Sequence, residues 1–107
     1  MRIYIAGKVS GEDIAQCTMK FGNAYQLIRL HGADAVNPLA VVNDWHITWQ
    51  MAMKKCIKAL MECDAVYALP CWKDSKGAQI ELDLAQKLGI KIYYTRKSLE
   101  NNLAPSA

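Results

Sequence analysis

Residues 64–89 have the sequence DAVYALPCWKDSKGAQIELDLAQKLG, in which an apolar run leads through a short polar loop into a helical pattern. The run at 64–69 is typical of a buried strand. Residues 75–88 are predicted to form a helix that begins at Ser75 and ends before Gly89. Its inward positions are expected to be Ile80, Leu84 and Leu88. A strand followed by a helix is half of a βαβ unit, so this stretch predicts an α/β domain.

The same alternation extends toward both ends of the chain. Further strands are predicted at 2–6, at 33–38, where Asn37 and Pro38 end the strand, and at 90–95. The order is βαβαβαβ, which predicts a parallel sheet of four to five strands with helices on both faces. In such sheets a ligand binds at the carboxyl ends of the strands, near the point where the strand order switches.

Two earlier helices complete the predicted order. The first is expected from about residue 11 to about residue 30, because Ser10 and Asp13 have the spacing of a capping box. The second passes through 51–63, with either Asn43 or Asp44 as its N-cap. The expected inward positions are Ile14, Phe21, Tyr25 and Ile28 in the first helix, and Met53, Cys56, Ile57 and Leu60 in the second. The prediction is one domain at 1–96, followed by a tail at 97–107 that is expected to fray.

Composition limits the classes of partner. The chain has 107 residues, of which 52% are hydrophobic and 21% charged, which fits one globular domain. Its net charge is +3, and its lysines and arginines are spread along the chain. This pattern argues against a nucleic-acid polymer as partner and leaves a single nucleotide or another small anion open.

The cysteines and the N-terminus indicate the compartment. None of the four cysteines forms a C-x-x-C pair, and His31 and His46 lack zinc-ligand spacing. We therefore expect reduced, mostly buried thiols in a cytoplasmic protein, with no metal and no cofactor. The N-terminal MRIYIAG is too short and too β-like for a signal peptide, and no apolar run approaches the roughly 20 residues that a membrane span needs.

Two loops rich in small residues follow the first and third predicted strands. In AGKVSGE, at 6–12, Gly7 and Gly11 allow the backbone to approach a ligand closely. In PCWKDSKGA, at 70–78, Ser75 and Gly77 repeat this arrangement at a helix N-terminus, where free N–H groups favour an anion. Neither loop is a Walker A or G-x-G-x-x-G motif. Well-capped ordinary turns remain the alternative interpretation.

Glu81 is the candidate catalytic group of the following helix. Asp83 has Lys87 four residues later as a partner, whereas Glu81 has only apolar residues at 84 and 85. Glu81 borders the predicted inward stripe, about 9 Å along the helix axis from Ser75. Gly77, one turn earlier, is expected to leave open space above the carboxylate. A carboxylate beside a sugar suits glycosidic chemistry as nucleophile or base, and the alternative is a carboxylate on the rim of the helix.

Four segments carry a family resemblance: IYIAGKVSG at 3–11, NP at 37–38, CDAVYALPCW at 63–72 and WKDSKGAQIELDLAQKLG at 72–89. They resemble a family of small uncharacterised bacterial and phage proteins. That family is related to nucleoside 2-deoxyribosyltransferases and to deoxynucleoside 5′-monophosphate N-glycosidases. The resemblance covers residues 1 to about 94. Its most specific part is Trp72-x-x-Ser75-x-Gly77-Ala78-x-x-Glu81.

The resemblance implies a flavodoxin-like (Rossmann-like) three-layer sandwich and a homodimer or larger homo-oligomer. It implies that Glu81 attacks C1′ of the sugar and that Tyr4 lies near the sugar and Glu81. It also implies that Ser75 and Gly77 bind the 5′-phosphate, as in the monophosphate-specific branch, and that the first loop lines the phosphate or sugar through Gly7, Val9 and Ser10. Lys8 and Trp72 are further candidate substrate-binding residues.

The sequence departs from these relatives at two positions. The monophosphate glycosidases have an arginine where this chain has Ser10, so we expect either a weaker affinity for phosphate or the use of Lys8 or Lys76 in its place. The relatives carry a catalytic aspartate eight residues before the position of Asp64, and that position is Cys56 here. A thiol substitutes poorly for a carboxyl that helps to protonate the leaving base. Asp44 and His46 are other candidates for a proton donor, and Asp64 itself is interpreted as structural.

Three tryptophans flank the expected cleft: Trp45, Trp49 and Trp72. Stacking on a base and burial in a dimer interface both remain open for them. The predicted function is cleavage or transfer of the N-glycosidic bond of a small nucleoside or nucleoside 5′-monophosphate. The alternatives are a nucleotide-binding or nucleotide-sensing protein with little or no turnover, and an interaction module that uses the tryptophans.

Overall fold

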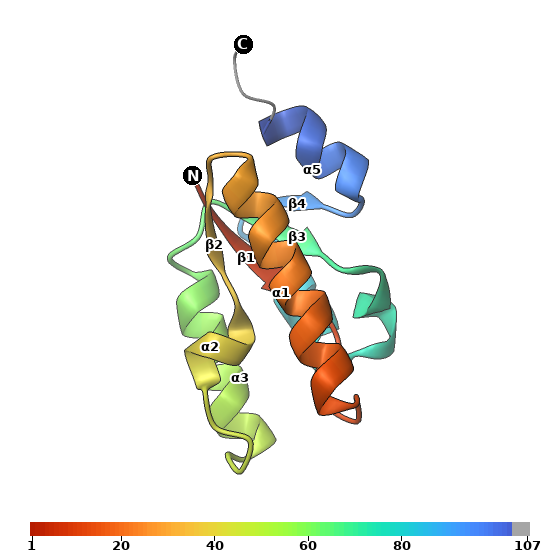
Figure 1. Ribbon diagram of the computed structural model, residues 1–107. Helices are drawn as coiled ribbons and strands as arrows, with labels where there is room; N and C mark the ends of the chain where they lie inside the picture. The colour runs from red at the N-terminus through yellow and green to blue at the C-terminus, as the bar shows by residue number, and fades with distance from the viewer. Residues whose placement is uncertain (104–107) are drawn as a thin grey trace.

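The computed structural model describes residues 1–103 and contains one parallel sheet of four strands (Figure 1). The strands are β1 (Arg2–Ala6), β2 (Asp34–Val36), β3 (Ala65–Ala68) and β4 (Lys91–Tyr93), arranged in the order β2-β1-β3-β4. The predicted α/β class with a flavodoxin-like, three-layer arrangement is confirmed. The strand order switches direction between β1 and β3, which both lie at the centre of the sheet.

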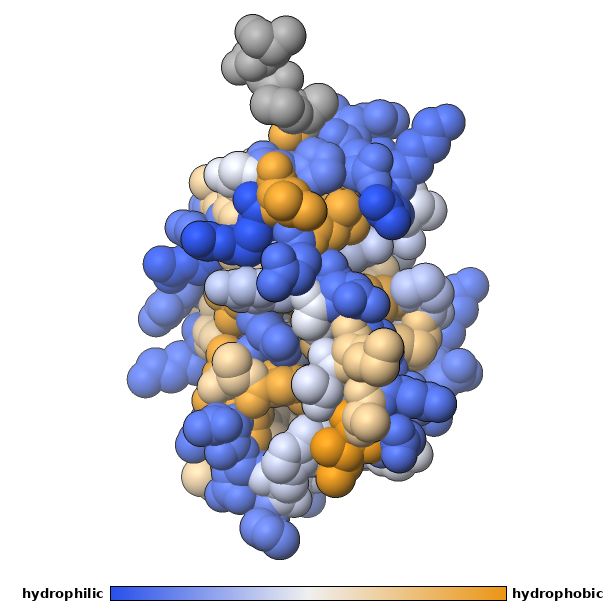
Figure 2. All heavy atoms as spheres, in the orientation of Figure 1, coloured by the Kyte–Doolittle hydropathy of each residue, from blue (hydrophilic) through white to orange (hydrophobic). Residues whose placement is uncertain are grey.

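Helices cover both faces of the sheet. The first face carries α1 (Ile14–Leu30) and α5 (Arg96–Leu103), and α1 lies across the front of the sheet in Figure 1. The second face carries α3 (Trp49–Leu60) and α4 (Lys76–Lys87). The short helix α2 (Pro38–Val42) follows β2, and the 3₁₀ helix η1 (Pro70–Asp74) follows β3. Hydrophilic side chains cover most of the face that carries α1 and α5, with apolar residues in separate patches between them (Figure 2).

Alternation along β1 divides the core into two halves. Ile3 and Ile5 pack against α1 and α5 with a cluster that includes Phe21. Tyr4 and Ala6 face the opposite way, toward α3 and α4. These four of the five β1 side chains are fully buried, as expected for a central strand covered on both faces.

Two helices begin later than the sequence predicts. The N-cap of α1 is Asp13, whose carboxylate accepts a hydrogen bond from the Gln16 N–H at 3.1 Å, so the predicted start near residue 11 was wrong. Ile14 in the first turn is 56% exposed and does not face inward. The N-cap of α3 is Thr48, not Asn43 or Asp44. The reason is that residues 38–42 form a separate helix that ends at Asn43, whose φ of 49° is left-handed.

The inward face of α4 also differs from the prediction. Ile80 and Leu88 are exposed, whereas the buried residues are Gly77, Ala78, Glu81, Leu82 and Ala85. Small side chains on this face allow the helix to approach the sheet and α3 closely. Glu81 therefore lies in the middle of the buried face and not at its border.

The predicted fraying tail is wrong for residues 97–103, which belong to α5. Leu99 is fully buried in the same cluster as Ile3 and Phe21, and the Thr95 hydroxyl caps the helix by accepting a hydrogen bond from the Ser98 N–H. The remainder of the predicted tail, 104–107, lies outside the described residues. Asp64 is structural as interpreted, because its carboxylate accepts a hydrogen bond from the Arg2 N–H at 2.8 Å.

The four cysteines are free thiols, and Cys17, Cys56 and Cys63 are buried. Within residues 1–103, no helix combines the length and the apolar character needed to cross a membrane.

Candidate active site

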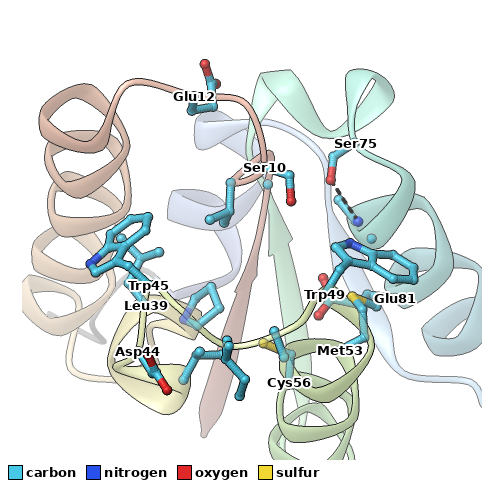
Figure 3. Close-up of a pocket in the computed structure, with 18 of the residues that line it drawn as sticks. Ser10, Glu12, Leu39, Asp44, Trp45, Trp49, Met53, Cys56, Ser75 and Glu81 are labelled. Carbon is cyan, nitrogen blue, oxygen red and sulfur yellow. Dashed lines mark hydrogen bonds between the residues drawn. The ribbon is translucent and has the colours of Figure 1, made fainter.

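A pocket of about 340 Å³ opens at the carboxyl ends of β1 and β3 (Figure 3). Its walls come from the loop after β1, from α2 and the segment that joins it to α3, and from the first turns of α3 and α4. This is the position at the switch in strand order where α/β sheets bind ligands. The predicted location of the site therefore coincides with a pocket of the structure.

Three buried side chains form the pocket floor, by which we mean Tyr4, Cys56 and Glu81. Tyr4 comes from the middle of β1, Cys56 from α3 and Glu81 from α4. The Tyr4 hydroxyl donates a hydrogen bond to Oε2 of Glu81 at 2.5 Å. Glu81 is 5% exposed, and among residues 1–103 it is the one charged side chain that is buried.

Burial changes the protonation of the floor. Desolvation raises the pKa of Glu81 to about 7 from its usual value of 4.5, while the hydrogen bond from Tyr4 acts in the opposite direction. Desolvation and the nearby Glu81 charge raise the pKa of Tyr4 well above its usual value of 10.0. Glu81 thus exchanges a proton near neutral pH, whereas Tyr4 stays a neutral hydrogen-bond donor.

Cys56 is the third member of the floor. Burial raises the pKa of its thiol, an effect that interaction with Tyr4 reduces and the charge of Glu81 increases. The thiol is therefore protonated and weakly acidic at neutral pH. Cys56 also packs with Leu60 and Val66 in the second half of the core, so the thiol contributes to the core as well as to the pocket floor.

The loop after β1 contributes Gly7, Val9, Ser10 and Gly11 to the pocket lining. A Cβ on Gly7 would lie 2.9 Å from Cδ1 of Leu69, so the backbone approaches the β3 side too closely for a larger residue. Gly11 has a φ of +80°, which favours glycine. Lys8 does not line the pocket; its backbone N–H donates to the Cys71 sulfur at 3.3 Å.

The second loop contributes Ser75 and Gly77. The Ser75 hydroxyl oxygen caps α4 by accepting a hydrogen bond from the Ala78 N–H at 3.1 Å. A Cβ on Gly77 would lie 2.9 Å from the Met53 sulfur and 3.8 Å from Nε1 of Trp49. The expectation of open space beside Gly77 was therefore wrong, because α3 packs directly against this turn.

Most of the wall formed by residues 38–53 was not predicted, but Trp45 and Trp49 were expected to flank the cleft and Asp44 was a candidate proton donor. Trp45 and Trp49 lie on opposite sides of the pocket, with Met53 beside Trp49 (Figure 3). Their exposed fractions are 53% and 36%. Trp72 does not line the pocket and packs with its ring centroid 5.7 Å from that of Tyr94. Trp45 and Trp49 therefore lie at the cleft as predicted, and the stretch NDWHITW was the signal for them.

The charges of the lining are acidic. Three carboxylates line the pocket, those of Glu12, Asp44 and Glu81. Among residues 1–103, no lysine, arginine or histidine does so. Glu12 forms an ion pair with Lys20 at 2.6 Å, and this contact lowers the pKa of the Glu12 carboxyl. His46, considered as a proton donor, lies outside the lining, and the Asp44 carboxylate accepts a hydrogen bond from its N–H.

These features define a flavodoxin-like α/β domain with a buried tyrosine–carboxylate pair under a pocket at the carboxyl ends of its strands. The chain belongs to the family described as Domain of unknown function (DUF4406), whose model matches residues 1–94. The matched region contains all four strands and the whole pocket lining, and it ends before α5. A comparison with curated proteins found no match.

Proposed function

We propose that this protein cleaves or transfers the N-glycosidic bond of a small nucleoside or nucleoside 5′-monophosphate, with Glu81 as the nucleophile at C1′ or as the base for a water molecule. The observation that carries the proposal is the Tyr4–Glu81 hydrogen bond in the pocket floor. A buried carboxylate without a cationic partner is costly, and such groups occur preferentially where chemistry requires them.

The geometry suits a transition state with positive charge on the sugar. Glycosidic cleavage develops oxocarbenium character at C1′, which a carboxylate in a water-poor pocket stabilises strongly. Tyr4 engages Oε2 of Glu81, which leaves Oε1 available for the sugar. With a pKa of about 7, Glu81 gains its reactive, ionised form as the pH rises through neutrality.

A second candidate is a nucleotide-binding protein that turns its ligand over slowly or not at all. The specific observation in its favour is Cys56, because a buried thiol with a raised pKa is a poor donor of a proton to a leaving base. This candidate retains the pocket and predicts ligand binding without base release.

The deciding experiment is base release from a panel of ribo- and deoxynucleosides and their 5′-monophosphates, followed by chromatography. Glu81→Gln should abolish release, since the amide is isosteric and cannot attack C1′. Asp83→Asn is the matched control, because Asp83 is exposed on the same helix and pairs only with Lys87. Release that persists in Glu81→Gln would contradict the assigned role of Glu81.

Absence of release at protein concentrations sufficient to detect one turnover would contradict the enzyme proposal for that panel. A thermal melt would then test the binding candidate. A ligand at 100 times its Kd should stabilise the protein by about 2.7 kcal/mol. Unchanged melting with every member of the panel would contradict the binding candidate as well.

The assembly and the compartment also remain proposals. We propose a homodimer or larger homo-oligomer in the cytoplasm, on the basis of the resemblance and the reduced cysteines. Light scattering coupled to size-exclusion chromatography tests the assembly, and a monomer at all concentrations would contradict it.

A further inference from the structure

We propose that the pocket binds a nucleoside with its base stacked on Trp45, and that it prefers purines to pyrimidines because the area of this stack sets the affinity. This inference rests on the proposed function, and it names the class of base and the residue that selects it. It joins three observations: the different chemistry of the two sides of the pocket, the surroundings of the Trp45 ring, and the polar side chains beside it.

The two sides of the pocket differ in chemistry. Glu81 and Ser75 lie on one side, together with Trp49 (Figure 3). This side suits the sugar, because C1′ must lie near the Glu81 carboxylate and the sugar hydroxyls need polar partners. Trp45 and Leu39 lie on the opposite side (Figure 3). A nucleoside whose C1′ lies at Glu81 therefore directs either its base or its 5′ end toward Trp45.

The Trp45 side suits a base better than a 5′ hydroxyl. The segment 38–47 lines the pocket with five apolar side chains, those of Pro38, Leu39, Val42, Trp45 and Ile47. Such a surface offers a hydroxyl no partner, so burying one against it is unfavourable. The base is the flat and largely apolar part of a nucleoside, and concave sites lined by apolar and aromatic side chains bind such groups. The base therefore matches the Trp45 side.

Of the three tryptophans, Trp45 has the ring that is available for stacking. The Trp72 ring packs against Tyr94, and Nζ of Lys76 lies 5.1 Å from the ring centroid of Trp49. Within residues 1–103, the Trp45 ring has neither an aromatic nor a cationic partner. It is also more exposed than that of Trp49, at 53% against 36%. An indole without such a partner in a pocket wall offers a face on which a base stacks.

The polar side chains beside Trp45 do not separate the two classes of base. In the segment 38–47 the polar residues of the lining are Asn43 and Asp44, both exposed. Asp44 Oδ1 already accepts a hydrogen bond from the His46 N–H at 2.9 Å. A carboxylate accepts from amino groups, which purines and pyrimidines both carry, and an amide pairs with donors and acceptors alike. The fused rings of a purine cover more of the indole than a single ring does, so the purine gains more from the stack.

The first test compares the 2′-deoxyribosides of unsubstituted purine and of pyrimidin-2-one. The two bases differ in ring area and neither carries an amino group, so the comparison reports chiefly on stacking. Binding is measured by titration calorimetry with Glu81→Gln, so that cleavage does not interfere. The purine nucleoside should bind about fivefold more tightly. Equal or weaker binding of the purine nucleoside would overturn the inference.

The second test removes the stacking ring in the same Glu81→Gln protein. Trp45→Ala should weaken binding of the purine nucleoside about tenfold and bring the two affinities together, whereas Trp45→Phe should retain part of the preference. Trp72→Ala is the matched control, because Trp72 lies outside the lining. Thermal melts establish that each variant is folded, and Trp45→Leu, which keeps apolar bulk without an aromatic face, replaces an alanine variant that does not fold. A preference for the purine that survives loss of the ring would overturn the assignment to Trp45.

The third test separates this inference from the proposed function. Base release by the wild-type protein should show a larger rate enhancement, relative to the reaction without protein, for the purine nucleoside. Glu81-dependent release with an equal or larger enhancement for the pyrimidine nucleoside would overturn the inference and leave the proposed function standing. Tighter binding of the purine nucleoside without release from any nucleoside would overturn the enzyme proposal and leave the inference standing for the binding candidate. Absence of binding to every nucleoside would overturn both.

Discussion

Tyr4 and Glu81 are 77 positions apart in the sequence, and the Tyr4 hydroxyl donates to the Glu81 carboxylate at 2.5 Å. One comes from the central strand and the other from the middle of α4's buried face. The contact fixes the carboxylate at the base of the pocket and makes Tyr4 the group through which Glu81 is oriented.

Removing this hydroxyl should change the pH profile as well as the rate. In Tyr4→Phe the hydrogen bond that lowers the pKa of Glu81 is lost, so the acid limb of base release should move to higher pH. We expect kcat/KM to fall about tenfold and stability to fall by about 1–3 kcal/mol, because a buried carboxylate loses its donor. Tyr94→Phe is the control, since Tyr94 is exposed and outside the lining. An unshifted acid limb in Tyr4→Phe would show that Tyr4 does not set the protonation of Glu81.

Stability should depend on pH through Glu81 with a definite sign. Its pKa is 4.5 when exposed and about 7 when folded, so the folded state binds the proton more tightly. The associated stability is fully present below pH 4.5 and is lost as the pH rises through about 7, a difference of about 3 kcal/mol. Denaturant unfolding of the wild type and Glu81→Gln at several pH values measures it. Because the amide of Glu81→Gln does not titrate, the wild type should lose stability relative to this variant as the pH rises over this window. A difference in unfolding free energy that stays constant with pH would contradict the raised pKa.

Substitution of alanine for glycine should raise stability at Gly22 but not at Gly77. Gly22, in α1, has nothing within 4 Å of an added Cβ, so Gly22→Ala should stabilise the protein by up to about 1 kcal/mol through helix propensity. In Gly77→Ala the same gain is opposed by the contact with the Met53 sulfur, so stability should stay level or fall. Chemical denaturation measures both. An equal gain at the two sites would mean that Met53 moves away at no cost.

The C-terminal helix should be part of the cooperative fold. Leu99→Ala removes a fully buried side chain and should destabilise the protein by about 2–5 kcal/mol. Lys97→Ala, on the exposed side of the same helix, should change stability by less than about 0.5 kcal/mol. A small effect of Leu99→Ala, comparable to that of the control, would indicate that α5 is dispensable, as the fraying prediction implied.

The success and failure of sequence reasoning here follow from the range of the interactions. Strand positions, helix order and the two loops depend on local patterns, and these led to Glu81, Ser75 and the glycines of the lining. The prediction of the inward face of α4 was wrong because Ile80, Leu84 and Leu88 form an apolar pattern as regular as that of the residues that are actually buried. Packing against α3 and the sheet selected the face with small residues, which no local pattern shows.

The pocket wall between β2 and α3 was predicted only in part: Trp45 and Trp49 were expected to flank the cleft, but α2 and its contribution to the lining were not. Its residues belong to a connection whose course depends on where α2 ends, at the left-handed Asn43. Their place around the pocket follows from the assembled fold and not from any motif. The same holds for Leu99, whose partners Ile3 and Phe21 lie at the opposite end of the sequence.

The parallel pairing of β1 with β3 joins Ile3 to Ala65 across roughly 60 residues of intervening chain. Closing so long a loop is entropically unfavourable until many contacts form together, which slows folding of such topologies. The Tyr4–Glu81 pair can therefore form only once α4 has docked against the sheet. A chain that ends before residue 81 contains the tyrosine and the first glycine loop but lacks the proposed nucleophile, so the candidate site is assembled by the last of the long-range contacts and not by either loop alone.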